Sequence, residues 1–430
     1  MNRFFTIFLS LALIPVFIAS CDQNAPEDIV LLRTDRFTEF KADHVESWVF
    51  ISDRQGQILD MYKTSEEVGV LEFEGVADET IAVTEVRVAS FDMSGSTRLQ
   101  HYITTHLGVP VGKTYLLEQN PDNGSGDPYT DTLSRAHLTL NNYSENGDPF
   151  RTIAFSDSYN QFNFWLDVST LAYDGSTFSA DMILRESPMD VFMSSYRDKI
   201  PVYRWLQDIK VGDDTMVDFD SFTPMNTIPV NKPVTHSYVE GQIEPEMGGR
   251  GYILTSTDYR RFSNNYDPSE IVPLGYVDGF DTYDTYVQVG DILCCEPHQN
   301  VTYHKLGSSV PESVSMPDSR FNLLNGNVYD LDFTFDNSYS YASFFFELKD
   351  DNNTLFWHVN AENGEQWAVP KLPSEITAKY PYLNRDELYL TSLRFTDNID
   401  GFSYEEKIAR DFELPRARTE FERFQYYMKF

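Results

Sequence analysis

Cysteine is scarce in this sequence. The 430 residues include three cysteines, and two of them, Cys294 and Cys295, are adjacent. So few cysteines exclude a scaffold of several disulfides, which is how many small secreted domains are stabilised. We therefore expect the domains to be held together by the burial of apolar side chains.

Basic residues are scarce as well. Lys and Arg number 33 against 67 Asp and Glu, which gives a formal net charge of −34 at pH 7. A field of this sign repels nucleic acid and anionic lipid surfaces, so we expect no nucleic-acid partner. We expect no cofactor, with calcium as the alternative, because acidic loops supply the oxygen ligands that calcium binds.

Motifs of the common enzyme classes are missing. The sequence has no Gly-x-Ser-x-Gly nucleophile elbow, no His-Glu-x-x-His zinc helix, no Gly-rich phosphate loop and no dinucleotide fingerprint. A glycosidase needs only two carboxylates that the fold holds several Å apart, and 67 acidic residues nominate no particular pair. We expect a protein that is not an enzyme, with catalysis as the open alternative.

Long apolar runs are missing except at the N-terminus. An uncharged stretch, residues 4–20, follows Arg3 and is short for a bilayer-spanning helix, which needs about 20 apolar residues. A run of this kind after a single basic residue is typical of a secretory signal peptide. No later apolar run approaches about 18 residues, so we expect no membrane span in the rest of the chain.

The end of this stretch carries a processing motif. Residues 18–21, Ile-Ala-Ser-Cys, resemble the lipobox of bacterial lipoproteins. The resemblance implies that residues 1–20 are a signal peptide that is removed, that Cys21 is the lipid attachment site, and that residues 21–28 form a polar tether. Several acyl chains suffice for stable attachment to membrane lipid. An ordinary signal peptide with a chance cysteine is the alternative.

Asp22 bears on the final location. After the lipidated cysteine of enteric bacteria this residue resembles an inner-membrane retention signal, whereas acidic residues there accompany export to the surface in other Gram-negative groups. We expect a lipid-anchored protein of the cell envelope, at the outer membrane or cell surface rather than the inner membrane.

Strand signals recur along the chain. Aromatic residues make up 15% of it, with 26 Tyr and 32 Phe, a composition that favours strands. Residues 329–336 alternate apolar and polar positions, which predicts a strand with Tyr329 and Phe335 on its buried face. Short helices are predicted only at residues 188–197 and 373–380, each opening with a proline.

The length predicts several domains, because single cores stop growing near about 250 to 300 residues. Stretches rich in turn-forming residues mark the boundaries. We predict an all-β protein of tandem antiparallel β-sandwich modules, immunoglobulin-like in architecture. Their expected ranges are 29–119, 129–228 and a long C-terminal region, 234–430, with a further division near 308–318.

Two regions share a repeating plan. A turn at residues 53–57 is followed by a strand at 81–88, and a turn at 350–354 by a strand at 388–395. In both strands the apolar positions fall at i, i+2, i+5 and i+7, which predicts a β-bulge in each. A weaker copy of the plan lies at 144–148 and 206–211. Internal duplication and chance likeness of amphipathic strands both fit this pattern.

Three sets of residues are candidates for a site. Cys294 and Cys295 point to opposite faces of a strand, so we expect a structural role, with a strained vicinal disulfide or a metal site as alternatives. Trp48, Trp205 and Trp357 lie in apolar strands that a core would absorb, whereas Trp165 and Trp367 are candidates for stacking on a ligand. Calcium candidates are Asp213, Asp214, Asp218 and Asp220, although solvated turns use Asp for backbone reasons alone.

The leading functional prediction is a membrane-anchored envelope lipoprotein with a non-enzymatic binding or scaffolding role, whose partner is a glycan or another envelope protein. A polysaccharide-acting hydrolase with an Asp/Glu pair is the first alternative. A structural subunit of a surface appendage or transport complex is the second, and it requires a strand edge open to a neighbour.

Overall fold

The fold is all-β, as predicted. The computed structural model describes residues 29–36, 45–65, 69–75, 79–93, 96–116, 134–143, 149–157, 166–184, 187–243, 251–258, 267–290, 298–364, 367–413 and 420–430. Strands dominate these ranges, and the helices are short: α2 (Pro149–Thr152), α3 (Ser374–Lys379), α4 (Tyr404–Glu413), and the 3-10 turns η1 (Phe219–Ser221) and η4 (Pro381–Leu383). No helix in the described ranges combines the length and apolarity needed to cross a bilayer.

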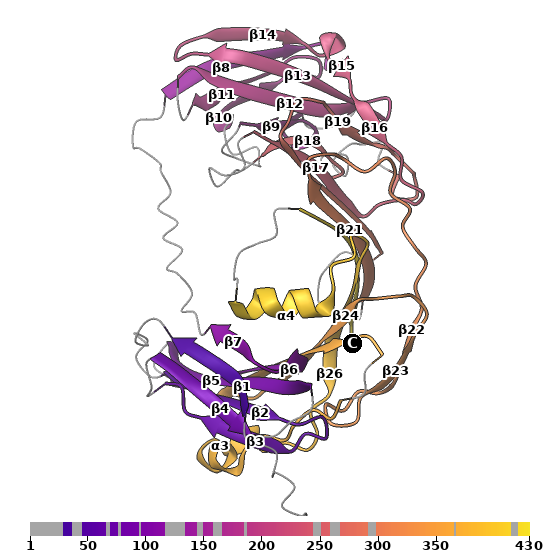
Figure 1. Cartoon of the computed structure of the whole chain (residues 1–430). Coiled ribbons are helices and arrows are strands. Elements are labelled where there is room, and N and C mark those ends of the chain that lie inside the picture. Colours follow the sequence, from indigo (N-terminus) through magenta and orange to yellow (C-terminus); the bar gives the residue numbers. More distant parts are fainter. Residues whose placement is uncertain are drawn as a thin grey trace, which may run out of the picture.

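One sheet of twelve strands runs through most of the molecule. It forms the curved back of a C-shaped chain, from β17 at the upper end to β3 at the lower end (Figure 1). In sheet order its strands are β18 (Tyr252–Ser256), β17 (His236–Gln242), β20 (Thr282–Gly290), β21 (His298–Gly307), β27 (Phe421–Lys429), β26 (Leu390–Asn398), β24 (Tyr341–Lys349), β25 (Asn353–Glu362), β6 (Ser96–Pro110), β5 (Thr80–Met93), β2 (Val45–Ser52) and β3 (Ile58–Tyr62).

The twelve strands fall into three units with the same strand order. In each unit the second strand pairs with the first, the first with the third and the third with the fourth, all antiparallel. The N-unit is β2, β3, β5 and β6; the middle unit is β17, β18, β20 and β21; the C-unit is β24 to β27. The predicted likeness between the first and last regions therefore extends to their topology. The third copy of this order lies at the middle unit, not at residues 144–211.

The hairpin turns of the N-unit and the C-unit are built alike. The Asp53 carboxylate accepts bonds from the backbone N–H groups of Gln55 and Gln57, at 3.0 and 2.8 Å. Asp350 does the same for Asn352 and Asn353, at 2.8 and 2.7 Å. Such carboxylate caps fix a turn locally. The two turns share this cap but differ in length, because Asp53 reaches the fourth residue after it and Asp350 the third.

The N-unit and the C-unit are joined edge to edge. Strand β6 pairs with β25 in parallel, from Leu99 opposite Asn353 to His106 opposite Asn360. Strands of the 29–119 region and of the 234–430 region thus belong to one sheet.

The two matching strand patterns have different physical causes. Along β26 the register slips by one residue between Leu390 and Ser392, so the apolar residues before and after this bulge face one core, as predicted. The bulge predicted within β5 is wrong. There Ile81 belongs to the core on the concave face of the sheet and Val86 to the core on the convex face, and ordinary alternation explains both.

A sandwich-like region caps the upper end of the long sheet. Two four-stranded sheets contribute buried side chains to one core, including Leu138, Phe178 and Met193. They are β10 (Leu166–Tyr173), β11 (Phe178–Leu184), β8 (Ser134–Asn141) and β14 (Asp214–Asp218), and opposite them β15 (Thr223–Pro224), β13 (Ile200–Ile209), β12 (Met189–Arg197) and β9 (Ala154–Ser156).

The predicted helices had different outcomes. Residues 374–379 do form α3, but the helix predicted at 188–197 is wrong, because those residues form β12. Strands β9 and β13 bond to both edges of β12, and nearly every residue along it is buried. A strand covered on both faces lacks the alternation by which a sequence distinguishes strand from helix.

Smaller elements cover the two faces of the long sheet. On the concave face lie α4 and a sheet of β4 (Gly69–Gly75), β1 (Ile29–Arg36) and β7 (Lys113–Leu116), which bury Leu31, Phe73 and Phe412 against it. On the convex face lie α3 and the hairpin of β22 (Phe321–Asn325) and β23 (Asp332–Phe335) (Figure 1). The pair β16 (Asn226–Ile228) and β19 (Leu274–Tyr276) lies near the sandwich-like region.

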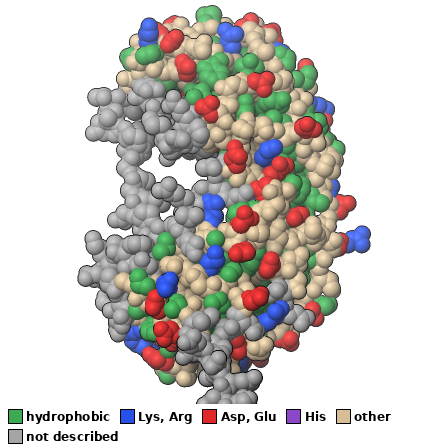
Figure 2. Space-filling view, viewed as in Figure 1, with side chains coloured by type: hydrophobic (Ala, Val, Ile, Leu, Met, Phe, Trp, Pro, Cys, Tyr) green, Lys and Arg blue, Asp and Glu red, His purple; other side chains and the backbone are tan. Residues whose placement is uncertain are grey.

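Acidic side chains are spread over the molecule. On the face shown in Figure 2 they are scattered from the sandwich-like region to the lower end. The net charge of −34 therefore does not come from a single acidic segment.

Candidate binding pocket

A pocket of about 510 Å³ lies on the convex face of the C-unit. We call it the Trp367 pocket. Its floor is apolar and consists of side chains of β24, β25 and β6: Ala342, Phe344, Phe346, Val359, Ala361 and Leu107. Its walls are residues 328–333 with Tyr339 on one side, and Glu362, Gly364 and residues 367–369 on the other. Volumes of about 300 to 1,000 Å³ are typical of small-molecule sites.

The first wall comes from the alternating stretch that the sequence analysis singled out. Tyr329, Leu331 and Phe333 are half-buried against the core, while Asp330 and Asp332 are exposed, as the alternation predicts. Regular pairing covers only Asp332–Phe335, because a turn precedes it. The Asn327 carboxamide accepts the Tyr329 backbone N–H at 2.9 Å and donates to the Asp386 carbonyl at 2.8 Å. This turn holds the wall in place at the edge of the pocket.

Trp367 in the second wall is positioned where the N-unit meets the C-unit. A side chain on Gly108 would place its Cβ 3.7 Å from Trp367 Nε1, and this glycine has a φ of +72°, a conformation that favours glycine. It lies in a bulge of β6, where the four residues from His106 to Val109 lie opposite the three residues from Ile81 to Val83 of β5. The Arg54 guanidinium lies 5.6 Å from the centre of the indole ring.

Three acidic residues, Asp330, Asp332 and Glu362, border the pocket, and no Lys, Arg or His is among the described residues that line it. Asp330 and Asp332 alternate with the core-facing Leu331 and Phe333, and Glu362 lies opposite Tyr341 of the concave core, so these side chains point away from the floor. Asp330 accepts a bond from the Asn325 carboxamide at 2.8 Å.

Two tyrosine hydroxyls add neutral polar groups. Burial raises the pKa of Tyr329 to about 12, with a smaller contribution from the nearby Asp386 carboxylate. Burial also raises the pKa of Tyr339. Both phenols therefore stay protonated at neutral pH and can donate hydrogen bonds. Apolar rings beside phenols suit a ligand that has an apolar face and a polar edge.

The other described tryptophans are packed inside the protein. Trp48 and Trp357 are buried, and the Trp357 indole N–H donates to the Thr105 hydroxyl at 3.0 Å. Trp205 is half-buried among Phe192, Tyr252 and Phe280, where the sandwich-like region meets the long sheet. The prediction that these three pack in cores is confirmed. Trp165 lies outside the described residues, as do Cys21, Cys294 and Cys295.

The four calcium candidates lie around β14, and all are exposed. Asp213 and Asp214 lie at its start and Asp218 and Asp220 at its end, about 13 Å apart at the rise of a strand. The Asp213 carboxylate accepts the Lys210 backbone N–H at 2.8 Å, and Asp218 accepts that of Asp220 at 2.9 Å. Within the described ranges, no three or more His, Cys, Asp or Glu side chains gather as metal ligands would.

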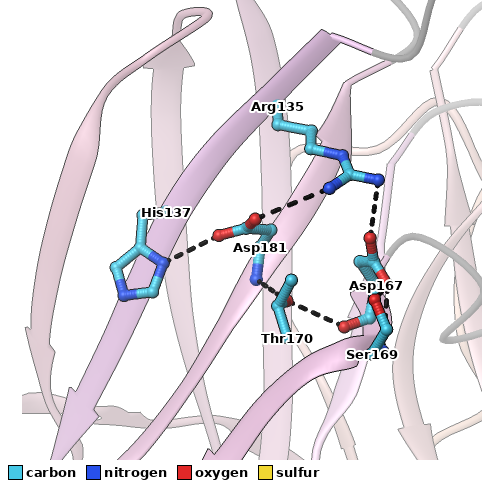
Figure 3. A network of polar contacts seen from close by, with 6 residues as sticks. All are labelled: Arg135, His137, Asp167, Ser169, Thr170 and Asp181. Atoms are coloured by element: carbon cyan, nitrogen blue, oxygen red, sulfur yellow. Dashed lines mark hydrogen bonds and ion pairs between the residues drawn. The ribbon is translucent and has the colours of Figure 1, made fainter.

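A polar network covers the neighbouring strands (Figure 3). Arg135 lies between two carboxylates, at 2.7 Å from Asp167 and 3.9 Å from Asp181, and His137 Nδ1 lies 2.8 Å from Asp181. Hydrogen bonds from Ser169 lower the pKa of the Asp167 carboxyl. The register of β10 shifts between Asp167 and Ala172. We interpret this network as the means by which the irregular strand is held to its sheet.

The concave face carries a second aromatic cluster, the concave ladder of His236, Tyr238, Tyr286 and His304. The two tyrosine rings stack with centroids 5.2 Å apart and planes 9° apart. Each histidine is bonded to a carboxylate: His304 Nε2 lies 2.8 Å from Asp284, and His236 Nδ1 lies 3.0 Å from Asp258. Cross-strand pairs of this kind stabilise a sheet.

No protein-family model, no curated protein and no solved structure matches this chain. The Trp367 pocket is therefore a candidate binding site on the grounds of its geometry alone. From the sequence, Trp367 was a candidate, while the alternation at 329–336 was a signal of a strand only. The floor residues came from strands more than 200 positions apart, and nothing in the sequence pointed to them.

Proposed function

We propose that this chain is a lipid-anchored protein of the cell envelope, at the outer membrane or cell surface, that binds a glycan in the Trp367 pocket without turning it over. The observation that carries the proposal is a pocket of about 510 Å³ with aromatic walls, an apolar floor and a polar rim. A sugar ring can stack its C–H face on such rings and bond its hydroxyls to the tyrosine phenols.

Binding can be tested with the chain from residue 22 onward on a glycan array, followed by calorimetry with the best hit. Trp367→Ala should weaken binding more than about tenfold, because stacked aromatic anchors dominate such sites. The matched control is Tyr173→Ala, which removes an exposed ring of the sandwich-like region outside the pocket. Equal affinity of the Trp367 variant and the control would contradict the proposal. Capture of an envelope protein in place of any glycan would contradict the glycan partner.

The lipid anchor is supported by residues 18–21 and can be tested on its own. Cells that express the full chain with an alkyne-bearing fatty acid should yield a labelled protein in the membrane fraction. Cys21→Ser should abolish the label and leave an unprocessed precursor. Protease added to intact cells should then cleave the wild-type protein if it lies at the surface. A labelled Cys21→Ser variant would contradict the assignment.

A polysaccharide-acting hydrolase is the second candidate, because three acidic residues, Asp330, Asp332 and Glu362, border the same pocket. A screen on polymeric substrates separates the two, since only the hydrolase predicts turnover that a single change such as Asp332→Asn abolishes.

A structural subunit has less support. The end strand β3 offers the sheet edge that such a role requires, but the Asp60 carboxylate accepts the Met61 backbone N–H at 2.8 Å. A carboxylate bonded to the edge discourages pairing with another strand. An immunoglobulin-like relationship of the sandwich-like region is also part of the proposal, supported by its two sheets around one core.

A further inference from the structure

The concave face of the C-unit reverses the charge balance of the chain. In the whole sequence, acidic residues outnumber basic ones by 67 to 33. The concave side chains of β24 to β27 alternate with those that contribute to the convex core. Among them the basic residues outnumber the acidic ones: Lys349, Arg394, Arg423 and Lys429 against Glu347 and Glu362.

Arg394 lies at the centre of this face and is exposed. Its neighbours in β26, Leu393 and Phe395, are buried in the convex core, so the Arg394 side chain points to the concave side. Its guanidinium lies 6.0 Å from the centre of the Phe345 ring. None of the described carboxylates lies within ion-pair distance of it. The described part of the chain therefore leaves this positive charge without a counter-charge in contact.

A second exposed cation lies next to Arg394. Lys429 on β27 pairs with Ser392, and Arg394 pairs with Tyr427, so the two cations are diagonal neighbours on adjacent strands. The Cα atoms of such a pair lie about 7 to 8 Å apart.

The acidic residues of this face lie further away. By register and strand spacing, the backbones of Glu347 and Glu362 are about 12 Å or more from those of Arg394 and Lys429. We call Arg394, Lys429 and the adjoining Phe345, His358 and Tyr427 the Arg394 patch.

The rings beside Arg394 present their edges rather than their faces. Phe345 and His358 stack on each other, with centroids 4.4 Å apart and planes 14° apart. Side chains stand roughly perpendicular to a sheet, so the edges of this stacked pair point outward. The face of an aromatic ring is negative and its edge is positive. The pair therefore adds to the attraction for an anion and offers a sugar ring little face on which to stack.

The field of Arg394 extends across the concave face. Burial lowers the pKa of His358 to about 4, and Lys407 and Arg394 add to this lowering. Burial raises the pKa of Tyr286 on β20, and Arg394 opposes that rise. At pH 7 His358 is neutral, so the charge of the patch comes from Arg394 and Lys429.

We infer that the Arg394 patch binds an acidic segment of a partner protein, in extended conformation and with carboxylates on alternate residues. Alternate side chains of an extended chain lie on one side, about 7 Å apart, which matches the separation of Arg394 and Lys429. A guanidinium can bind a carboxylate through two parallel hydrogen bonds. The patch lies inside the curve of the C-shaped chain, where a flat lipid surface does not reach (Figure 1). It is separate from the Trp367 pocket, which lies on the other face of the sheet.

Calorimetry with synthetic peptides on the chain from residue 22 onward tests the inference. The first peptide alternates four glutamates with four serines, the second has glutamine in place of glutamate, and the third has four glutamates followed by four serines. We expect the alternating glutamate peptide to bind at least about tenfold more tightly than the glutamine peptide, with an affinity that falls as salt is raised. We expect it to bind at least about threefold more tightly than the third peptide, in which the carboxylates are not spaced alternately.

Variants with one charge removed locate the binding surface. Arg394→Gln should weaken binding of the alternating peptide more than about tenfold, and Lys429→Gln more than about threefold. The matched control is Lys210→Gln, which removes the same charge from an exposed position of the sandwich-like region and should bind as the wild type does. Thermal unfolding shows whether each variant is folded, and Lys429→Gln carries the test if Arg394→Gln is not.

The outcomes separate this surface from the glycan site. Equal binding of the glutamate and glutamine peptides, or unchanged binding by folded Arg394→Gln, would overturn the inference. Equal binding of the alternating and block peptides would overturn the extended geometry. A galacturonate trisaccharide or phosphatidylglycerol vesicles that bind the wild type in place of the peptide, and not Arg394→Gln, would overturn the protein partner. Trp367→Ala should leave peptide binding unchanged, and Arg394→Gln should leave glycan binding unchanged, so either proposal can fail alone.

Discussion

Two aromatic clusters lie on opposite faces of the same sheet, and they differ in what their rings contact. In the concave ladder, Tyr238 and Tyr286 stack on each other, and each neighbouring histidine has its own carboxylate. In the Trp367 pocket, the rings surround a volume of about 510 Å³ that no described side chain fills. Aromatic content alone therefore does not identify a candidate binding site, whereas rings that border open volume do.

The difference comes from the backbone around each cluster. The ladder lies on regular antiparallel strands, where opposite residues are close enough for their side chains to meet. The pocket lies where the chain leaves regular pairing: before β23 on one wall and after β25 on the other. Irregular segments thus form the walls, while the sheet supplies a rigid floor.

The largest expected effect on stability comes from a substitution on β17, on the face opposite the concave ladder. Gly241 lies on β17, and a Cβ there would approach the Phe280 ring to 2.5 Å. Gly241→Ala should lower the free energy of unfolding by about 3 kcal/mol, measured in urea, because an overpacked core must shift. Gly307→Ala is the control, since a Cβ there meets no atom within 4 Å. Equal stability of the two variants would show that the packing around β17 yields easily.

The second prediction concerns acid. Burial, with Lys407 and Arg394, lowers the pKa of His358 on the concave face to about 4. The His358 side chain of the unfolded chain binds a proton below about pH 6.5, whereas that of the folded chain binds one only below about pH 4. The contribution of His358 to the free energy of unfolding is therefore full above about pH 6.5 and is lost as the pH falls towards about 4. The loss is at most about 3 kcal/mol for this residue.

Urea unfolding of the wild type and His358→Gln at several pH values checks this sign. The variant should be less dependent on pH between 6.5 and 4, because glutamine does not titrate. Buried His106, whose pKa is also lowered by burial, should keep part of the dependence in both proteins. Parallel curves would show that His358 is not protonated differently in the two states.

The smallest expected effect separates the two clusters most sharply. Tyr286→Ala should lower the free energy of unfolding by about 2 kcal/mol, because it removes a half-buried ring that stacks on Tyr238. Its affinity for the pocket ligand should equal that of the wild type, whereas Trp367→Ala should lose affinity. Thermal unfolding and calorimetry on the two variants give both readings. A loss of ligand binding in the Tyr286 variant would place the ligand on the concave face.

Some features could be read from the sequence because they depend on neighbouring residues. The alternation at 329–336 predicted the buried and exposed sides of a pocket wall, and the residues after Asp53 and Asp350 predicted two turns, each capped by its Asp carboxylate. The all-β class followed from composition. Local rules are sufficient for such features.

Other features depend on contacts between distant parts of the chain. Strand β6 meets β25 across more than 250 residues, and this junction places Gly108 against Trp367. The apolar patterns of β5 and β26 look alike. In β5, however, the first apolar residues face the concave core and the later ones the convex core, whereas β26 contains a bulge. Strand β12 is buried on both faces, so its sequence shows no strand alternation. No local pattern distinguishes these cases.

The most direct test of the central claim is a crystal structure of the chain from residue 22 onward with the tightest-binding glycan of the array bound. The account predicts a sugar ring stacked on Trp367, with ring carbons within about 4 Å of the indole. A sugar on the concave ladder, or a Trp367 pocket closed by its own side chains while the sugar binds elsewhere, would contradict it.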